Sequence, residues 1–176
     1  ADALTGESIR SELRAAAGYC HSLKFPNGGD LPLGDAMEIA LYQFAWNGRK
    51  DLTGGVRAAE LPFDADRKRM SVVIEQQGSR TLYCKGAPES LLAISDRILV
   101  DGETRPLDVQ ARQLVVDAQD RMAETGLRVL ALAFRPLAAA EQGGEEQLVI
   151  CGLIGLEDPP RPEVPAQIDS SPPPVH

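Results

Sequence analysis

The sequence has few cysteines, no long apolar run and no excess of positive charge. Its three cysteines, Cys20, Cys84 and Cys151, are widely spaced and form no CxxC pair and no cluster with histidine. This pattern excludes a structural zinc site or a disulfide framework and predicts three small buried side chains in a reducing compartment. No stretch approaches the ~20 apolar residues of a membrane span, and nothing resembles a signal peptide. We therefore expect a cytosolic chain, or the cytosolic part of something larger, without direct membrane contact.

Acidic residues outnumber basic ones, 26 to 18, which gives a formal net charge of -8. The phosphates of a nucleic acid or an anionic membrane would repel such a surface, so neither is an expected partner. A small phosphorylated ligand such as ATP remains compatible with this charge, provided that a few cations lie where its phosphates bind. The length of 176 residues fits one domain with a sizeable core.

Short apolar runs separated by turn signals dominate the middle of the chain and predict strands. Because regular strand–helix–strand alternation is missing, we expect an α+β fold: an antiparallel sheet of about six strands flanked by helices. The expected strands cover 56–63, 69–76, 80–86, 97–107 (as a small hairpin), 127–137 and 146–158, and the expected helices cover 6–23, 35–46, 87–95 and 108–125.

Local signals define several ends of these elements. Asp35 is an expected N-cap, and an apolar stripe of Met37, Leu41 and Phe44 follows it. "QQGS" and the pair Asp101-Gly102 predict hairpin turns. Gly126 follows the long helix in the usual position of a C-terminal glycine.

Two segments carry chemistry that points to a phosphorylated ligand. "KGAPES" joins a strand to a helix, where free N–H groups favour an anion, Gly86 permits close approach and Lys85 adds positive charge. An exposed lysine before a turn explains the same pattern. Phe63 lies beside the charged run "DADRKR", which suits a purine stacked on a ring, or a core phenylalanine next to a solvated turn. Arg128, at the start of a strand, suits a phosphate or a nearby glutamate.

Five segments occur in a fixed order: "GDAMEIAL", "PFDADRKRMSVV", "KGAPESLL", "MAETGLRVLALAFR" and "GLIGLEDPPRPEV". This series resembles the nucleotide-binding (N) domain of P-type cation-transporting ATPases, in the branch of calcium and sodium pumps. The resemblance covers nearly the whole chain, and "KGAPE", "RKRMSVV" and "DPPRPE" are specific in combination. It implies ATP binding on the cytoplasmic side of a membrane-embedded translocase.

The resemblance assigns roles to matching positions. Phe63 matches the aromatic residue on which adenine stacks, and Lys85 matches a lysine at the deep end of the adenine pocket, where Gly86 lets the base lie close. Glu38 matches the acidic residue that accepts a hydrogen bond from the adenine amino group. Arg128 matches an arginine that reaches toward the phosphates.

Further positions follow from the same resemblance. Leu130 lines the pocket, and Lys68 and Met70 stand at its wall. Asp158 and Arg161 resemble the hinge to the phosphorylation domain, where they help to clamp the closed state. The expected divisions are a hinge remnant at 1–8, the nucleotide-binding domain at 9–157, the hinge at 158–168 and a disordered tail at 169–176.

Two departures affect the expected affinity. Relatives often carry threonine where this chain has Met37, and serine or arginine where it has Ala65. Because neither residue supplies a polar contact, we expect weak ATP binding by the isolated domain.

The chain contains no "DKTGT", "TGD" or "GDGxND" motif. We therefore expect no catalytic residue and no metal site, and expect ATP to be bound without turnover. In the full-length pump, Mg-ATP bound here would deliver its γ-phosphate to an aspartate on the phosphorylation domain. That domain and the actuator domain are the expected partners.

Two other functions are compatible with the sequence. One is a regulatory or protein-docking module that has the same fold but has lost nucleotide binding, which Met37 and Ala65 support. The other is a free-standing phosphotransferase or phosphatase. For that, His21 and His176 are far apart in the sequence and no convincing pair of nucleophile and base is present.

The motif "LTGES" at residues 4–8 matches the actuator signature of the same pumps. Only about thirty residues separate Glu7 from Glu38, which is too few for the membrane helices and the phosphorylated aspartate that lie between these domains in a pump. We therefore expect Glu7 to be a first-turn acid of a helix and to have no catalytic role.

Overall fold

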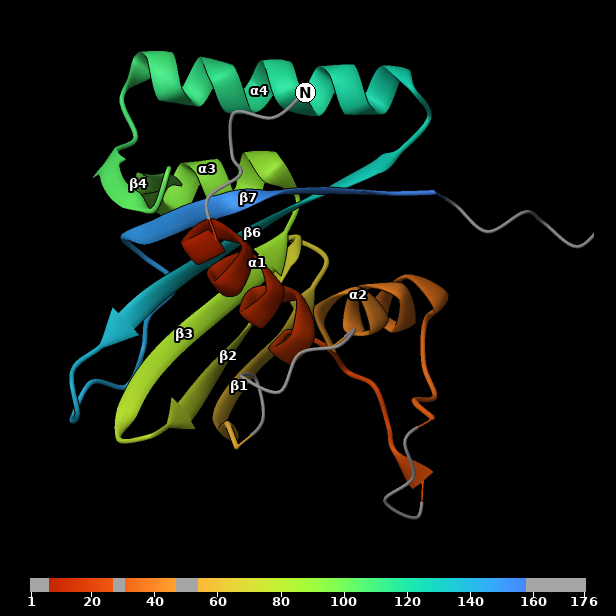
Figure 1. Ribbon diagram of the computed structural model, residues 1–176, viewed down its shortest axis with the longest axis vertical. Helices are drawn as coiled ribbons and strands as arrows, with labels where there is room; N and C mark the ends of the chain where they lie inside the picture. Colours follow the sequence, from red (N-terminus) through yellow and green to blue (C-terminus); the bar gives the residue numbers. More distant parts are fainter. Residues whose placement is uncertain (1–6, 27–30, 47–53, 158–176) are drawn as a thin grey trace, which may run out of the picture.

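The computed structural model describes residues 7–26, 31–46 and 54–157. Within them, seven strands form one sheet in the order β1-β2-β3-β6-β7-β4-β5, and helices cover both faces (Figure 1). The helices are α1 (Glu7–Tyr19), α2 (Ala36–Trp46), α3 (Pro88–Ile94) and α4 (Val109–Glu124). The strands are β1 (Val56–Asp64), β2 (Arg69–Gln76), β3 (Ser79–Gly86), β4 (Ser95–Val100), β5 (Glu103–Pro106), β6 (Arg128–Leu137) and β7 (Leu148–Leu156).

Alternating side chains of the central strands form two cores, one on each face of the sheet. Met70, Val72 and Ile74 of β2 pack in the cluster that contains the buried residues of α1 and α2. Val73 lies on the opposite face, in the cluster that includes Leu91 of α3. A third cluster, on this second face, joins α4 to β4 and β7. The expected α+β class is confirmed.

The sheet differs from the expected one in two respects. It has seven strands in the described residues instead of about six, because the hairpin at 97–107 contributes two separate strands, β4 and β5. It is also mixed, since β4 pairs with β7 in parallel while the other neighbouring pairs are antiparallel. That pairing joins segments about fifty residues apart, and local turn signals carry no information about it.

The expected local signals are present. Asp35 caps α2, because its side chain accepts a hydrogen bond from the backbone N–H of Met37 at 2.9 Å. Both hairpin turns have two central residues with positive φ, as a type I′ turn requires: Gln77-Gly78 and Asp101-Gly102. Helix α4 ends before Gly126, whose φ is +82°. Helix α1 begins at Glu7, as "GES" predicts.

The apolar stripe predicted for α2 is wrong at one position. Leu41 is buried, but Phe44 is 40% exposed, and Ala45 takes a buried position instead. The guanidinium of Arg14 lies 4.5 Å from the centroid of the Phe44 ring. This cation–π contact covers a ring that the core does not enclose.

The three cysteines are buried free thiols, as predicted. Burial raises the pKa of Cys20 to about 12, so its thiol is protonated at neutral pH. None of the described helices is long and apolar enough to cross a membrane. The residues predicted at the hinge, Asp158 and Arg161, and the predicted tail lie outside the described residues.

His21 lies just after α1 and packs against α2. Its ring centroid lies 5.9 Å from that of Phe25 and 5.4 Å from that of Tyr42. Its Nδ1 accepts a hydrogen bond from the backbone N–H of Leu23 at 3.2 Å. Burial, followed by the charge of nearby Arg57, lowers the pKa of His21 to about 4, so the imidazole is neutral at neutral pH.

This low pKa predicts a loss of stability in acid. A histidine in the unfolded chain has a pKa near ~6.5, so the unfolded state binds a proton below that pH that the folded state does not bind until about pH 4. As the pH is lowered through this range, the free energy of unfolding should therefore fall more steeply in the wild type than in His21→Phe, which keeps a ring but cannot titrate. Denaturant unfolding across this pH range measures the difference, and parallel curves for the two proteins would contradict it.

Candidate functional site

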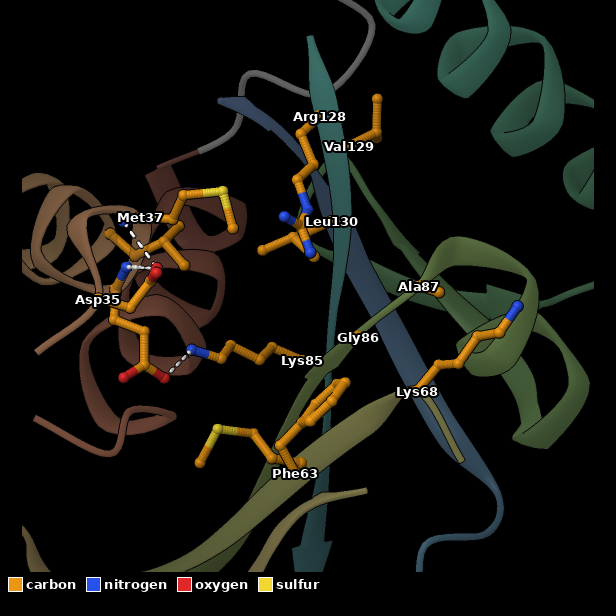
Figure 2. A pocket seen from close by; sticks show the side chains of 13 residues that line it. Asp35, Met37, Phe63, Lys68, Lys85, Gly86, Ala87, Arg128, Val129 and Leu130 are labelled. Carbon is orange, nitrogen blue, oxygen red and sulfur yellow. Dashed lines mark hydrogen bonds and ion pairs between the residues drawn. The ribbon is translucent and has the colours of Figure 1, made fainter. Parts of the chain in front are cut away.

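A pocket of about 520 Å³ opens between α2 and the ends of the central strands (Figure 2). Such a volume is typical of small-molecule sites. The pocket is lined by all eight residues that the resemblance assigns to nucleotide binding, which come from four segments of the chain: Glu38, Phe63, Lys68, Met70, Lys85, Gly86, Arg128 and Leu130. The fold thus gathers the expected set around one space.

An ion pair spans the pocket from α2 to β3. The Nζ of Lys85 lies 2.8 Å from Oε1 of Glu38, and Oε2 of Glu38 accepts a hydrogen bond from the backbone N–H of Ser22 at 3.1 Å. Lys85 is only 8% exposed, so it is not the exposed lysine before a turn that its sequence also allows. Each carboxylate oxygen keeps a further lone pair with which it can accept a hydrogen bond from a ligand.

Phe63 presents its ring to the pocket from the edge strand β1. The residue is 62% exposed, so it is not a core phenylalanine, and its surface is available to a planar ligand. All nine residues of β1 are exposed. The position of Phe63 therefore depends on the pairing of β1 with β2 and on the turn that joins them, because no element of the described chain covers the ring.

Lys68 lies in that turn, with a φ of +52°. Its Nζ pairs with Oε1 of Glu89 at 3.1 Å, and both side chains are exposed. Figure 2 shows its side chain directed away from Phe63 and Lys85. Lys68 thus borders the pocket through its backbone and stem, while its ammonium group lies toward α3.

The anion site expected at the start of α3 is absent from this part of the described structure. The backbone N–H of Ala87 already donates to the carbonyl oxygen of Lys68 at 3.0 Å, Pro88 has no N–H, and the N–H of Glu89 binds its own carboxylate. The prediction of free N–H groups from "KGAPES" is therefore wrong at Ala87, whose N–H is used by a tertiary contact, and at Pro88, which has no N–H.

Strand β6 supplies another wall of the pocket. Arg128 and Leu130, two residues apart, both line the pocket because alternate residues of a strand face the same side. Arg128 is exposed, and no described acidic side chain forms an ion pair with it. Its exposed guanidinium belongs to the pocket lining. Met70 of β2 forms part of the buried floor.

Glycine is required at position 86 for a structural reason in addition to the one that the resemblance implies. A Cβ atom built there would lie 2.5 Å from the carbonyl oxygen of Lys68 and 2.5 Å from the Cβ of Arg69. The β1–β2 turn therefore packs directly on this glycine. Because Gly86 has no side chain, the β1–β2 turn can lie against its backbone, beside the pocket.

Five further residues line the pocket that the expected set did not contain: Asp35, Met37, Leu41, Ala87 and Val129. Met37 and Leu41 lie one helical turn apart on α2, and Asp35 is the capping residue three positions before Glu38, so Glu38 together with this periodicity indicates them. Ala87 and Val129 are sequence neighbours of expected residues. No group of metal-ligating side chains is present among the described residues.

Comparison with known proteins identifies relatives across the chain. The family described as P-type ATPase, cytoplasmic domain N matches residues 10–163. A calcium-transporting ATPase of Listeria monocytogenes is 30% identical over 147 residues, which cover 79% of this chain and 17% of that protein. Calcium-transporting ATPase 1 of Bacillus cereus is 35% identical over 152 residues, with 82% and 17% covered. The P-type magnesium-transporting ATPase 1 of Escherichia coli is 36% identical over 107 residues, with 58% and 12% covered.

The packing at Gly86 predicts that even one added methyl group is costly. In Gly86→Ala, the Cβ would overlap backbone atoms of the β1–β2 turn, so the turn must shift. We expect a loss of about 1–3 kcal/mol in the free energy of unfolding, measured by denaturant titration. Gly144→Ala is the control, since its Cβ would meet only the flexible carboxylate of Glu146, at 3.2 Å. Equal stability of the two variants would contradict the packing argument.

Proposed function

The chain belongs to the family of P-type ATPase cytoplasmic domain N, and from this premise we propose that it binds ATP in the pocket between α2 and the sheet. The observation that carries the proposal is the convergence of an exposed ring, a partly buried ion pair and an exposed arginine on one pocket. Each group suits a different part of a nucleotide. The pocket's volume of about 520 Å³ is also adequate for a ligand of this size.

The geometry supports one orientation of the nucleotide. The adenine base stacks on Phe63, at the end of the pocket where the Lys85–Glu38 pair offers a donor and an acceptor. The amino group of adenine donates to the carboxylate of Glu38. The phosphates then extend toward the exposed guanidinium of Arg128, whose fork of donors suits phosphate oxygens.

We further propose that the chain is the nucleotide-binding part of an ATP-driven cation pump. The matched relatives are calcium- and magnesium-transporting ATPases, and the chain spans 17% or less of their length. In this account, Mg-ATP held here delivers its γ-phosphate to an aspartate on a separate phosphorylation domain, on the cytoplasmic side of the membrane. The phosphorylation and actuator domains of the pump are its partners, and this chain alone does not hydrolyse ATP.

One observation favours a second function, a docking or regulatory domain without nucleotide binding. The polar groups deepest in the pocket, Lys85 and Glu38, already satisfy each other. Met37 adds a thioether to the lining, and Ala65 supplies no polar group at the β1–β2 turn. A ligand must then compete with an internal ion pair. If the chain binds ATP, this competition favours weak binding, and if the chain is a docking or regulatory domain, it favours the absence of ATP binding.

Replacing the stacking residue distinguishes these accounts. The wild type should bind ATP saturably, at millimolar or tighter concentration, in a calorimetric titration without magnesium. Phe63→Ala removes a base–aromatic contact that contributes about 1–3 kcal/mol, so its Kd should rise roughly 5- to 150-fold.

Leu61→Ala is the matched control. Leu61 lies two residues earlier on the same exposed strand, is 42% exposed and does not line the pocket, so its replacement should leave the Kd unchanged. An unchanged Kd in Phe63→Ala would refute the stacking assignment. Absence of ATP binding by the wild type would favour the docking domain.

A further inference from the structure

A buried carboxylate outside the pocket holds the turn between β1 and β2. Glu145 lies in the loop between β6 and β7, and its side chain is only 7% exposed. Its Oε2 accepts hydrogen bonds from Nη1 of Arg67 at 2.5 Å and Nε of Arg69 at 2.8 Å. Its Oε1 accepts a hydrogen bond from Oγ of Ser71 at 2.6 Å. One loop side chain is thus joined to three residues of the turn and of β2.

The charge of this carboxylate is stabilised by its partners. Burial alone would raise the pKa of Glu145, but hydrogen bonds from Arg67, Ser71 and Arg69 outweigh it and hold the pKa below its ordinary value. Both guanidinium groups bond to this carboxylate, and Arg67 also lies 3.9 Å from Oδ1 of the more exposed Asp64. Removing the charge of Glu145 would leave Arg67 with this longer contact and Arg69 with no ion-pair partner among the described residues.

The two arginines transmit this anchoring to the backbone near the pocket. Nη2 of Arg67 donates to the carbonyl oxygen of Pro62 at 2.8 Å, directly before Phe63. Nη1 of Arg69 donates to the carbonyl oxygen of Arg67 at 3.2 Å. The hydroxyl of Ser90, on α3, donates to that same carbonyl at 2.6 Å.

These contacts add to the packing on Gly86 and to the hydrogen bonds that the carboxylate of Asp64 accepts from the backbone N–H groups of Asp66 and Arg67, at 3.0 and 2.8 Å. Every residue of β1 is exposed, and its register with β2 is irregular between Leu61 and Asp64, next to Phe63. The turn that follows contains Lys68 in the left-handed conformation, where a residue with a side chain is strained. The hydrogen bonds of Glu145 tie this turn and the start of β2 to the loop between β6 and β7.

We propose that Glu145 is a positioning residue for the pocket: by holding Arg67 and Arg69 it fixes the β1–β2 turn and thereby the ring of Phe63. It does not touch the ligand and is absent from the pocket lining. Its effect on binding rests on the proposed function, whereas its effect on the turn does not. The two effects can therefore be measured separately.

The first experiment uses the protein without ligand. Glu145→Gln keeps the shape of the side chain and removes its charge, and Glu146→Gln, at the exposed neighbouring position, is the control. We expect hydrogen exchange, measured by NMR, to accelerate about tenfold or more at the amides of Lys68 and Ala87 in Glu145→Gln. These amides donate to the carbonyl oxygens of Asp64 and Lys68. Amides of α4 should be unaffected. Uniform acceleration across the domain, or no change at the turn, would overturn the proposal.

The second experiment tests the link to Phe63 through a double-mutant cycle. Glu145→Gln should weaken ATP binding about three- to tenfold in the wild-type background and have no further effect in Phe63→Ala, because it acts through that ring. The same loss in both backgrounds would show that Glu145 does not act through Phe63. If the wild type fails to bind ATP, the proposed function fails, and hydrogen exchange alone decides whether Glu145 positions the turn.

Discussion

The partly buried ion pair between Lys85 and Glu38 is the contact on which the pocket depends. It joins the centre of the sheet to α2 at 2.8 Å, across the space that a ligand would enter. Where water is partly excluded, the attraction between the two charges is strong. Each charge has also lost hydration, and the attraction of its partner offsets that cost. Loss of either partner would leave the other charge without its ion-pair partner in this partly buried setting. The pair therefore maintains the pocket and supplies its deepest polar groups.

The β1–β2 turn forms the other side of the pocket and depends on different interactions. It packs on Gly86 at a distance that excludes any side chain, and it is anchored from the loop between β6 and β7 by Glu145. Phe63, which lies at the end of an exposed edge strand, takes its position from these contacts. The Lys85–Glu38 pair thus holds α2 against the sheet from within the pocket. The β1–β2 turn is held from outside the pocket, by packing on Gly86 and by hydrogen bonds to Glu145.

Much of the fold follows from local chemistry in the sequence. Asp35 caps α2, glycine-containing pairs make the two hairpin turns, and Gly126 ends α4, because each signal acts within a few residues. Non-local features were not predictable in this way. The parallel pairing of β4 with β7 depends on the whole sheet, and the exposed ring of Phe44 contacts Arg14, thirty residues earlier in the chain.

The candidate site divides in the same way. The expected set of residues came from a resemblance in motif order, and the structure brings its eight pocket members together. Their local states were not predictable: the N–H groups at the start of α3 are already bonded, and the ammonium of Lys68 pairs with Glu89. Glu145 lies in a polar loop with no periodicity, so no sequence signal distinguished it from Glu146.

The most direct test of the account is to map the ATP site on the isotopically labelled chain. Amide chemical shifts would be followed by NMR as ATP is added without magnesium. The account predicts saturable shifts at Gly86, Ala87, Val129 and Leu130, with the amides of α4 unchanged. Shifts confined to residues away from the pocket, such as the turn at Gln77-Gly78, or no saturable shifts at all, would contradict it.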